Sequence, residues 1–112
     1  MFIYHITSKQ EWQQALSVGQ YLPGHYAADG FIHCSKKEQV AAVANRIYTN
    51  QTDLILLKID ISRLAIRVKE ENLDGGSELF PHIYGPLPVA AVVGSAALIY
   101  HPVSGFTFPE SL

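Results

Sequence analysis

Short stretches of alternating apolar and polar side chains, a pattern typical of strands with one buried face, recur along the chain. Residues 2–6 alternate in this way and place His5 opposite Tyr4 and alongside Thr7. Residues 54–60 carry apolar side chains on both faces at their start, which predicts the most buried strand of the fold. The pattern therefore predicts that strands supply much of the core.

Two helices are predicted from capping residues and from apolar residues at helical spacing. The first follows Ser8 and ends at Gly19, and the second follows Ser35 and spans residues 36–48. In each case a glutamate three residues after the serine completes a capping box. Two helices combined with several strands predict an α+β fold.

The segment DGFIHCSKKEQV, residues 29–40, combines a turn, a short strand and a helix start. A strand over 31–34 places Phe31, His33 and Ser35 on one face and Cys34 on the other. His33 then lies close to a helix N-terminus, where backbone amides favour a bound anion such as phosphate. The alternative for a lone histidine is a hydrogen-bonded residue of the core.

A second group of polar residues follows later in the chain. Residues 65–70 alternate as a strand, which leaves Glu71 on its polar side if the strand continues. Residues 79–87, LFPHIYGPL, contain two prolines and a glycine and are predicted to be irregular and rigid. His82 and Tyr84 share one side of this segment if it is extended, so both rings could face one pocket.

The remaining segments are shorter and are predicted from turn-forming and β-branched residues. They are a short strand at 20–22, loops at 23–29, 49–53 and 72–77, a helical turn at 61–64, one or two strands over 89–100 broken at Gly94, and a tail or edge element at 101–112. We assign His101 no function.

Composition limits the class of protein. A chain of 112 residues with 48% hydrophobic residues predicts one compact domain, residues 1–112. A formal net charge of −2 argues against broad nucleic-acid binding, which needs a basic face. A single cysteine excludes an intramolecular disulfide, and the first residues lack the features of a signal peptide, so we expect a cytoplasmic protein. No apolar run approaches the ~20 residues that cross a bilayer.

Candidate chemistry rests on histidines in separate segments. The chain lacks HxxxH, HxH and CxxC motifs, so we expect no metal. Cys34 is predicted to be a small buried hydrophobic residue, because strand parity directs it away from His33. His5, His33 and His82 are predicted to line one concave site.

Five segments together resemble a known family: YHIT near the start, GFIHCS before the second helix, ANRIY at its end, the strand LILLKID, and FPHIYGPL. They resemble the bacterial family described as domain of unknown function 952, over residues 4–93. The resemblance implies a fold similar to that of ADP-ribosyltransferases. In such a fold two small sheets, mixed or antiparallel, meet in a split α+β core with two main helices and hold NAD between them.

The resemblance also implies roles for individual residues. His5 matches the polar residue that these enzymes carry on their first strand, and His33 or Ser35 matches a later one. Glu71 matches the acid that stabilises positive charge on the ribose when a nicotinamide glycosidic bond breaks. The chain departs from those enzymes because Glu70 and Glu71 are adjacent and face opposite sides of a strand.

The first hypothesis is an NAD- or nucleotide-dependent transferase or glycohydrolase with a histidine-lined cleft and NAD as its expected cofactor. Its predicted catalytic residues are Glu71, His33 and His82, and its predicted cofactor-binding residues are His5, Thr7, Phe31, Ser35 and Tyr84. The alternative is a non-catalytic module that binds a small phosphorylated ligand or nucleotide. A third hypothesis is a metal-dependent hydrolase built from His5, His33 and His82.

Overall fold

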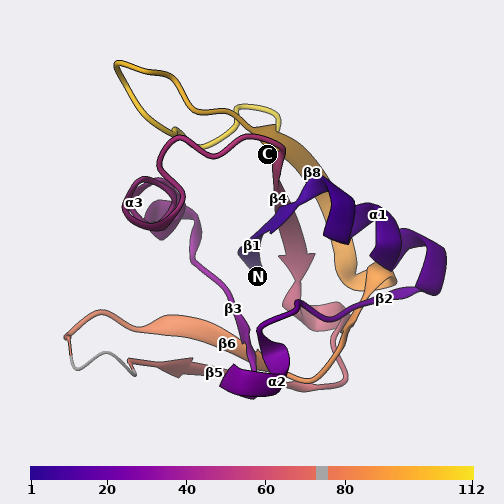
Figure 1. Ribbon diagram of the computed structural model, residues 1–112. Coiled ribbons are helices and arrows are strands. Elements are labelled where there is room, and N and C mark those ends of the chain that lie inside the picture. Colours follow the sequence, from indigo (N-terminus) through magenta and orange to yellow (C-terminus); the bar gives the residue numbers. More distant parts are fainter. Residues whose placement is uncertain (73–75) are drawn as a thin grey trace.

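The first sheet places the most apolar strand of the chain at its centre. β4 (Leu54–Asp60) lies between β1 (Phe2–Ser8) and β8 (Val92–Leu98), and both neighbours are antiparallel to it (Figure 1). Leu56 and Leu57 of β4 are completely buried. The prediction of a most buried strand at 54–60 is therefore confirmed.

The second three-stranded sheet is also antiparallel and lies below the first in Figure 1. Its central strand, β6 (Phe80–Tyr84), pairs with β3 (Ile32–His33) on one side and with β5 (Arg67–Glu71) on the other. The prediction of an irregular segment over 79–87 is wrong in this part. Pro81 pairs with Glu70 of β5, and its carbonyl accepts from the Cys34 amide at 3.0 Å just past the end of β3. Its missing amide proton therefore falls at the end of the ladder with β3, where proline is tolerated.

A two-residue sheet joins β2 (Gln20–Tyr21) and β7 (Leu87–Pro88). A 3-10 turn (Val89–Ala91) follows β7 and leads into β8. β8 is one strand through Gly94 rather than two strands, although its register with β4 shifts there, where Lys58 pairs with Gly94 and Ile59 with Val92. Gly94 matters for packing instead, since a Cβ atom at this position would lie 3.0 Å from the side chain of Leu112.

The first helix, α1 (Lys9–Val18), begins and ends where predicted, but only the Ser8 half of the predicted capping box forms. The Glu11 amide donates to the Ser8 hydroxyl at 3.1 Å, and Gly19 ends the helix with a φ of 98°. The carboxylate of Glu11 accepts from the Gly24 amide at 3.3 Å, so it ties the following loop to the helix.

The second predicted helix is shorter than expected and is capped differently. A 3-10 turn (Lys37–Gln39) precedes α3 (Val40–Ile47). The predicted cap at Ser35 is wrong, because the Ser35 backbone is paired with Tyr4 in an isolated β-bridge. The cap falls one residue later, where the Lys36 amide donates to the Gln39 side chain at 2.9 Å.

A short helix, α2 (Tyr26–Asp29), occupies the segment that was predicted to be a loop over 23–29. The small residues between its ends gave no apolar periodicity from which a helix could be predicted. Gly30 ends it with a φ of 79°, a conformation that glycine adopts without strain. The helical turn predicted at 61–64 is confirmed as a 3-10 turn (Ile61–Arg63).

Two groups of buried side chains form the core, because β1 is buried on both faces. Ile3 packs into one group and Tyr4 into the other. The C-terminal segment completes the second group with Phe106, so it is more than the tail or edge element that was predicted. Asn45 of α3 fixes this segment through hydrogen bonds of 2.8 and 3.0 Å to the backbone of Phe106.

These elements form one compact α+β domain with antiparallel sheets. The structure is a computed structural model that describes residues 1–72 and 76–112. The middle of the loop predicted at 72–77 lies outside the described residues.

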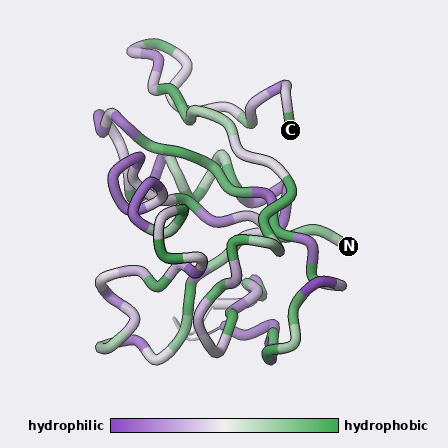
Figure 2. The backbone as a smooth tube through the Cα atoms, turned by 90° about the vertical axis from the view of Figure 1, so that its right-hand side faces the viewer, coloured by the Kyte–Doolittle hydropathy of each residue, from purple (hydrophilic) through white to green (hydrophobic). Residues whose placement is uncertain are grey.

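Hydrophobic and hydrophilic stretches alternate along the backbone (Figure 2). Within the described ranges, no helix has the length and apolar character needed to cross a membrane. The cytoplasmic location stays a prediction.

Replacing Phe106 by alanine should lower the free energy of unfolding by about 3–5 kcal/mol, because the ring is buried and leaves a cavity. Val103→Ala is the matched control, since Val103 is fully exposed and its loss should change stability by less than about 0.5 kcal/mol. Urea denaturation of both variants measures the difference. Equal stability would mean that the C-terminal segment does not pack as described.

Candidate functional site

A pocket of about 390 Å³ opens where β1, β3, α3 and β6 meet. His5 of β1, His33 of β3 and His82 of β6 all line it. The prediction that these three rings share one concave site is therefore confirmed, whereas their chemical roles stay predictions. Strands distant in the sequence supply the three rings, and the two sheets hold them at fixed positions.

His5 is held from both sides in the wall of the pocket. Its Nδ1 lies 2.5 Å from the carbonyl oxygen of His33, and its Nε2 lies 2.8 Å from the hydroxyl of Tyr21. A carbonyl can only accept, so Nδ1 carries the proton and Nε2 accepts from Tyr21. The hydroxyls of Tyr21 and Thr7 lie 2.9 Å apart and extend the chain of hydrogen bonds.

This environment keeps His5 neutral. Burial lowers the pKa of His5 to about 4, outweighing the hydrogen bond to His33, which acts in the opposite direction. Both ring nitrogens are already bonded, so His5 offers none to a ligand or a metal. The metal set predicted from His5, His33 and His82 therefore cannot form, although His5 still shapes the wall.

Glu71 joins two of the predicted site residues. His82 Nδ1 lies 3.1 Å from Glu71 Oε1, and the Tyr84 hydroxyl donates to the same oxygen. The contact arises because β5 and β6 are paired and their alternating side chains place these groups on one face of the sheet. The predicted parity of His82 and Tyr84 is confirmed.

The hydrogen bonds fix the charge on Glu71 and the tautomer of His82. The pKa of Glu71 is lowered chiefly by the hydrogen bond that Tyr84 donates to it and, to a smaller extent, by the one from His82. The carboxylate is therefore ionised near neutral pH, and the pKa of Tyr84 is raised because Glu71 accepts from it. An ionised carboxylate can only accept, so the proton of neutral His82 lies on Nδ1. Nε2 of His82 then remains for a ligand.

Phe31, Tyr84 and Thr7 contact residues of the pocket or their hydrogen-bond partners. Phe31 stacks on His82 with ring centroids 4.1 Å apart and an angle of 24° between the rings. None of these three contributes to the lining of the pocket. Their contacts support the rings of His82 and His5, whereas a direct contact with a cofactor stays a prediction.

Ser35 and Cys34 differ in what they offer to a ligand. Ser35 lines the pocket, and its hydroxyl has no hydrogen-bond partner among residues 1–72 and 76–112. Burial raises the pKa of the Cys34 thiol, which keeps it protonated and unreactive. The structure therefore supports the prediction that Cys34 is a buried hydrophobic residue.

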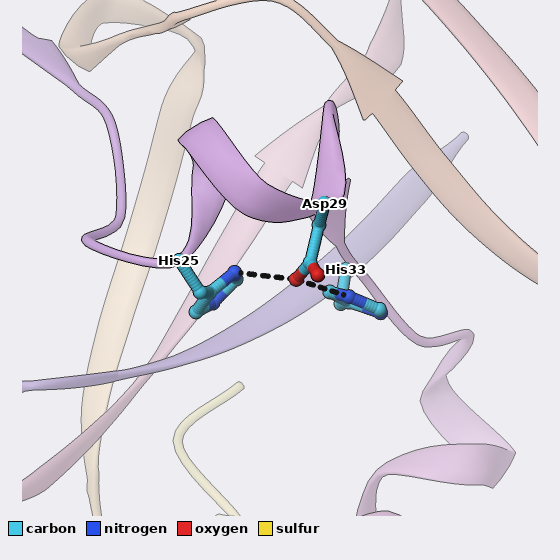
Figure 3. A group of neighbouring side chains, drawn as sticks. All are labelled: His25, Asp29 and His33. Atoms are coloured by element: carbon cyan, nitrogen blue, oxygen red, sulfur yellow. Dashed lines mark hydrogen bonds and ion pairs between the residues drawn. The ribbon is translucent and has the colours of Figure 1, made fainter.

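Two histidines share a carboxylate on the open side of the pocket (Figure 3). Asp29 Oδ2 lies 3.0 Å from His25 Nδ1 and 3.0 Å from His33 Nε2. The hydrogen bond from His33 is the main cause of the lowered pKa of Asp29. Sequence reasoning missed His25 and Asp29, although a spacing of four residues between successive members was a usable signal.

Arg46 was also missed. It lies on α3, in the segment ANRIY, and lines the same pocket. The side chains of His33 and Arg46 can carry positive charge, whereas Asp29 and Glu71 carry negative charge. The lining therefore combines side chains that can be positively charged with carboxylates.

Comparisons with known proteins found a family model and solved structures that are similar to this chain. A family model described as "Protein of unknown function (DUF952)" matches residues 6–95. The crystal structure of protein CC0527 from Caulobacter crescentus is 34% identical, covers 96% of this chain and 94% of its own, and has a TM-score of 0.85. The solution NMR structure of CC0527 is 36% identical, covers 94% and 90%, and has a TM-score of 0.80. No curated protein matches.

Stability should depend on pH through His5. Its pKa is about 4 in the folded state against an ordinary value of 6.5, so between these values only the unfolded chain binds the proton. The contribution of His5 to the free energy of unfolding is fully present above pH 6.5 and is lost as the pH is lowered. At pH 4 the loss due to His5 is about 3 kcal/mol. Urea denaturation from pH 7 to pH 4 measures this loss.

His5→Asn is the matched variant, because an amide can donate to the His33 carbonyl but does not titrate. The variant should be less stable at pH 7 and should lose less stability on acidification than the natural protein. Parallel losses in the two proteins would show that His5 is not the group responsible.

Proposed function

Because the chain belongs to the DUF952 family of proteins of unknown function, as its motifs predicted, we infer its activity from the pocket and from the likeness to ADP-ribosyltransferases that those motifs imply. We propose an enzyme that cleaves or transfers at the glycosidic bond of NAD or a related nucleotide. The observation that carries this proposal is the ionised Glu71, which holds His82 in the lining of a pocket of about 390 Å³. That volume suits a small ligand or one half of a dinucleotide.

Glu71 supplies the negative charge that such a reaction needs. Breaking a nicotinamide glycosidic bond sends the bonding electrons to the leaving base and leaves positive charge on the ribose. A carboxylate held in position stabilises this charge where it develops. Oε1 of Glu71 is used by Tyr84 and His82, while Oε2 has a lysine at 3.5 Å and remains available to a ribose hydroxyl.

We assign His82 the role of general base. Nδ1–H donates to Glu71, so Nε2 can take the proton of an attacking water or acceptor hydroxyl. The oxygen of that nucleophile forms the new bond to the ribose carbon as nicotinamide leaves with the electrons of the broken glycosidic bond. Phe31 stacks on the imidazole and restricts its rotation.

His33, Arg46 and Ser35 are the groups proposed to bind the substrate. Arg46 can pair with phosphate oxygens, and the unpartnered hydroxyl of Ser35 can donate to one of them. The likeness to ADP-ribosyltransferases that the motifs imply supports a nucleotide over other anions.

The second candidate is a non-catalytic module that binds a small phosphorylated ligand or nucleotide. The presence of Arg46 and His33 in the lining favours it, because both can contact an anion without further chemistry. The two candidates differ in what they require of Glu71. Catalysis depends on its charge, whereas anion binding should improve when that charge is removed.

Glu71→Gln should lower the rate of nicotinamide release from NAD by about 10²–10³-fold, the usual cost of removing one electrostatic stabiliser of a transition state. Binding of ADP-ribose should persist. Chromatography of released nicotinamide measures the rate, and a thermal-shift assay measures binding. Retained binding with no turnover by the natural protein would favour the module, and equal rates for both proteins would refute the role of Glu71.

Tyr84→Phe should move the acidic limb of the pH–rate profile to higher pH. Tyr84 donates to Glu71 and is the main cause of its lowered pKa, so losing the hydroxyl raises that pKa. The activity that depends on ionised Glu71 is then lost at a higher pH as the solution is acidified. Tyr100→Phe is the control, since Tyr100 lies in the C-terminal part of the core. An unchanged profile would contradict the assigned interaction.

A further inference from the structure

Three side chains on the open side of the pocket converge on one point (Figure 3). The nitrogen and oxygen atoms that His25, Asp29 and His33 can offer to a metal all lie within 4.8 Å of one another. We propose that these three residues bind a divalent transition-metal ion of the zinc class. The absence of metal motifs had led to the opposite expectation, because sequence spacing alone did not show that this group assembles.

The donor set fits such an ion. Two imidazole nitrogens and one carboxylate oxygen are the ligands that zinc and neighbouring first-row metals bind, whereas calcium and magnesium prefer oxygen alone. Three protein ligands leave at least one coordination position open. A water molecule or an oxygen of a bound anion can fill it.

The distances fit as well. Metal–ligand bonds of about 2.0–2.1 Å place the ligand atoms of a tetrahedral site about 3.3 Å apart. Asp29 Oδ2 already lies 3.0 Å from both histidine nitrogens. Rotation of the two half-exposed imidazole rings can bring the third pair of atoms, His25 Nδ1 and His33 Nε2, to the same separation.

The proton balance requires only a change of tautomer. Each neutral imidazole donates to Asp29 in the absence of a metal, through Nδ1 of His25 and Nε2 of His33. To bind the ion, each ring moves its proton to its other nitrogen. The side chains are 47% and 54% exposed, so water can exchange these protons. Asp29 binds the ion through its ionised carboxylate, so it has no proton to release.

The backbone holds the three residues in place. His25 is the residue before α2, and Asp29 is the last residue of that helix, one turn away. Gly30 then reverses the chain, so that His33, on β3, returns to the same carboxylate. Tyr26 of α2 packs against the core, which anchors the helix to the domain.

A purely structural role explains this arrangement less well. Exposed ion pairs contribute little to stability, and one histidine would suffice to pair with Asp29. Two imidazoles on one carboxylate oxygen, beside a pocket, form a ready metal site. The His33 ring also contacts the ring of His82 at a centroid distance of 5.4 Å, so the ion would lie near the proposed base. His33 is also one of the proposed substrate contacts, and an ion bound there would contact an anion of the substrate in its place. Binding of the ion does not itself require the proposed reaction.

Calorimetric titration of tag-free protein with Zn²⁺ should show one ion bound per chain. His25→Ala, Asp29→Asn and His33→Ala should each weaken binding by more than the roughly 10- to 100-fold loss that follows removal of an outer-shell partner. Titration with Co²⁺ should give the intense visible absorption of a four- or five-coordinate site, which the same variants should abolish.

His101→Ala is the matched control, because His101 is an exposed histidine away from the pocket and should leave the affinity unchanged. Circular dichroism confirms that each variant is folded. No binding by the natural protein, or equal affinities for the natural protein and the three variants, would overturn the metal site. Neither outcome bears on nicotinamide release, which tests the proposed reaction separately.

Discussion

The junction between β1 and the chain just after β3 is the constraint on which the rest of the structure depends. Tyr4 and Ser35 exchange two backbone hydrogen bonds of 2.8 and 2.7 Å, and the His5 ring donates to the carbonyl of His33 beside them. These bonds join the two three-stranded sheets. Residues on both sides of this junction, including Tyr4, Ser35 and His82, line the pocket. The junction therefore sets where the sheet that carries His33 and His82 lies relative to β1.

The junction also distinguishes His5 from the other two predicted histidines that line the pocket. His5 uses both nitrogens to hold the sheets together and is kept neutral by burial. His82 uses one nitrogen for Glu71 and keeps the other for the pocket. His33 contributes its backbone to the junction and its side chain to Asp29. The same residue type therefore serves three purposes within one small domain.

Much of the fold could be predicted because local chemistry determined it. β4 and α1 were found from apolar runs, a serine cap and a terminating glycine, all of which act over a few residues. The shared side of His82 and Tyr84 followed from strand parity. The predicted cap at Ser35 was wrong because the Ser35 backbone pairs with Tyr4. Tyr4 lies 31 positions earlier in the sequence, so no local pattern shows this contact.

The missed part of the site has the same physical origin. His25 and Asp29 lie in α2, which is too short to show apolar periodicity, and its contact with His33 depends on the reversal at Gly30. The pairing of Glu71 with His82 needed the register of β5 and β6, which no single segment reveals. Sequence patterns identified individual side chains, whereas sheet pairing determined which of them meet.

The central claim is that Glu71 orients His82 so that its Nε2 faces a ligand. Nitrogen-15 NMR of the imidazole rings tests it directly, because the chemical shifts distinguish the two tautomers. The account predicts that His82 carries its proton on Nδ1 and that its Nε2 resonance moves when ADP-ribose is added, while His101 is unaffected. A proton on Nε2, or a His82 resonance that does not respond to the ligand, would contradict it.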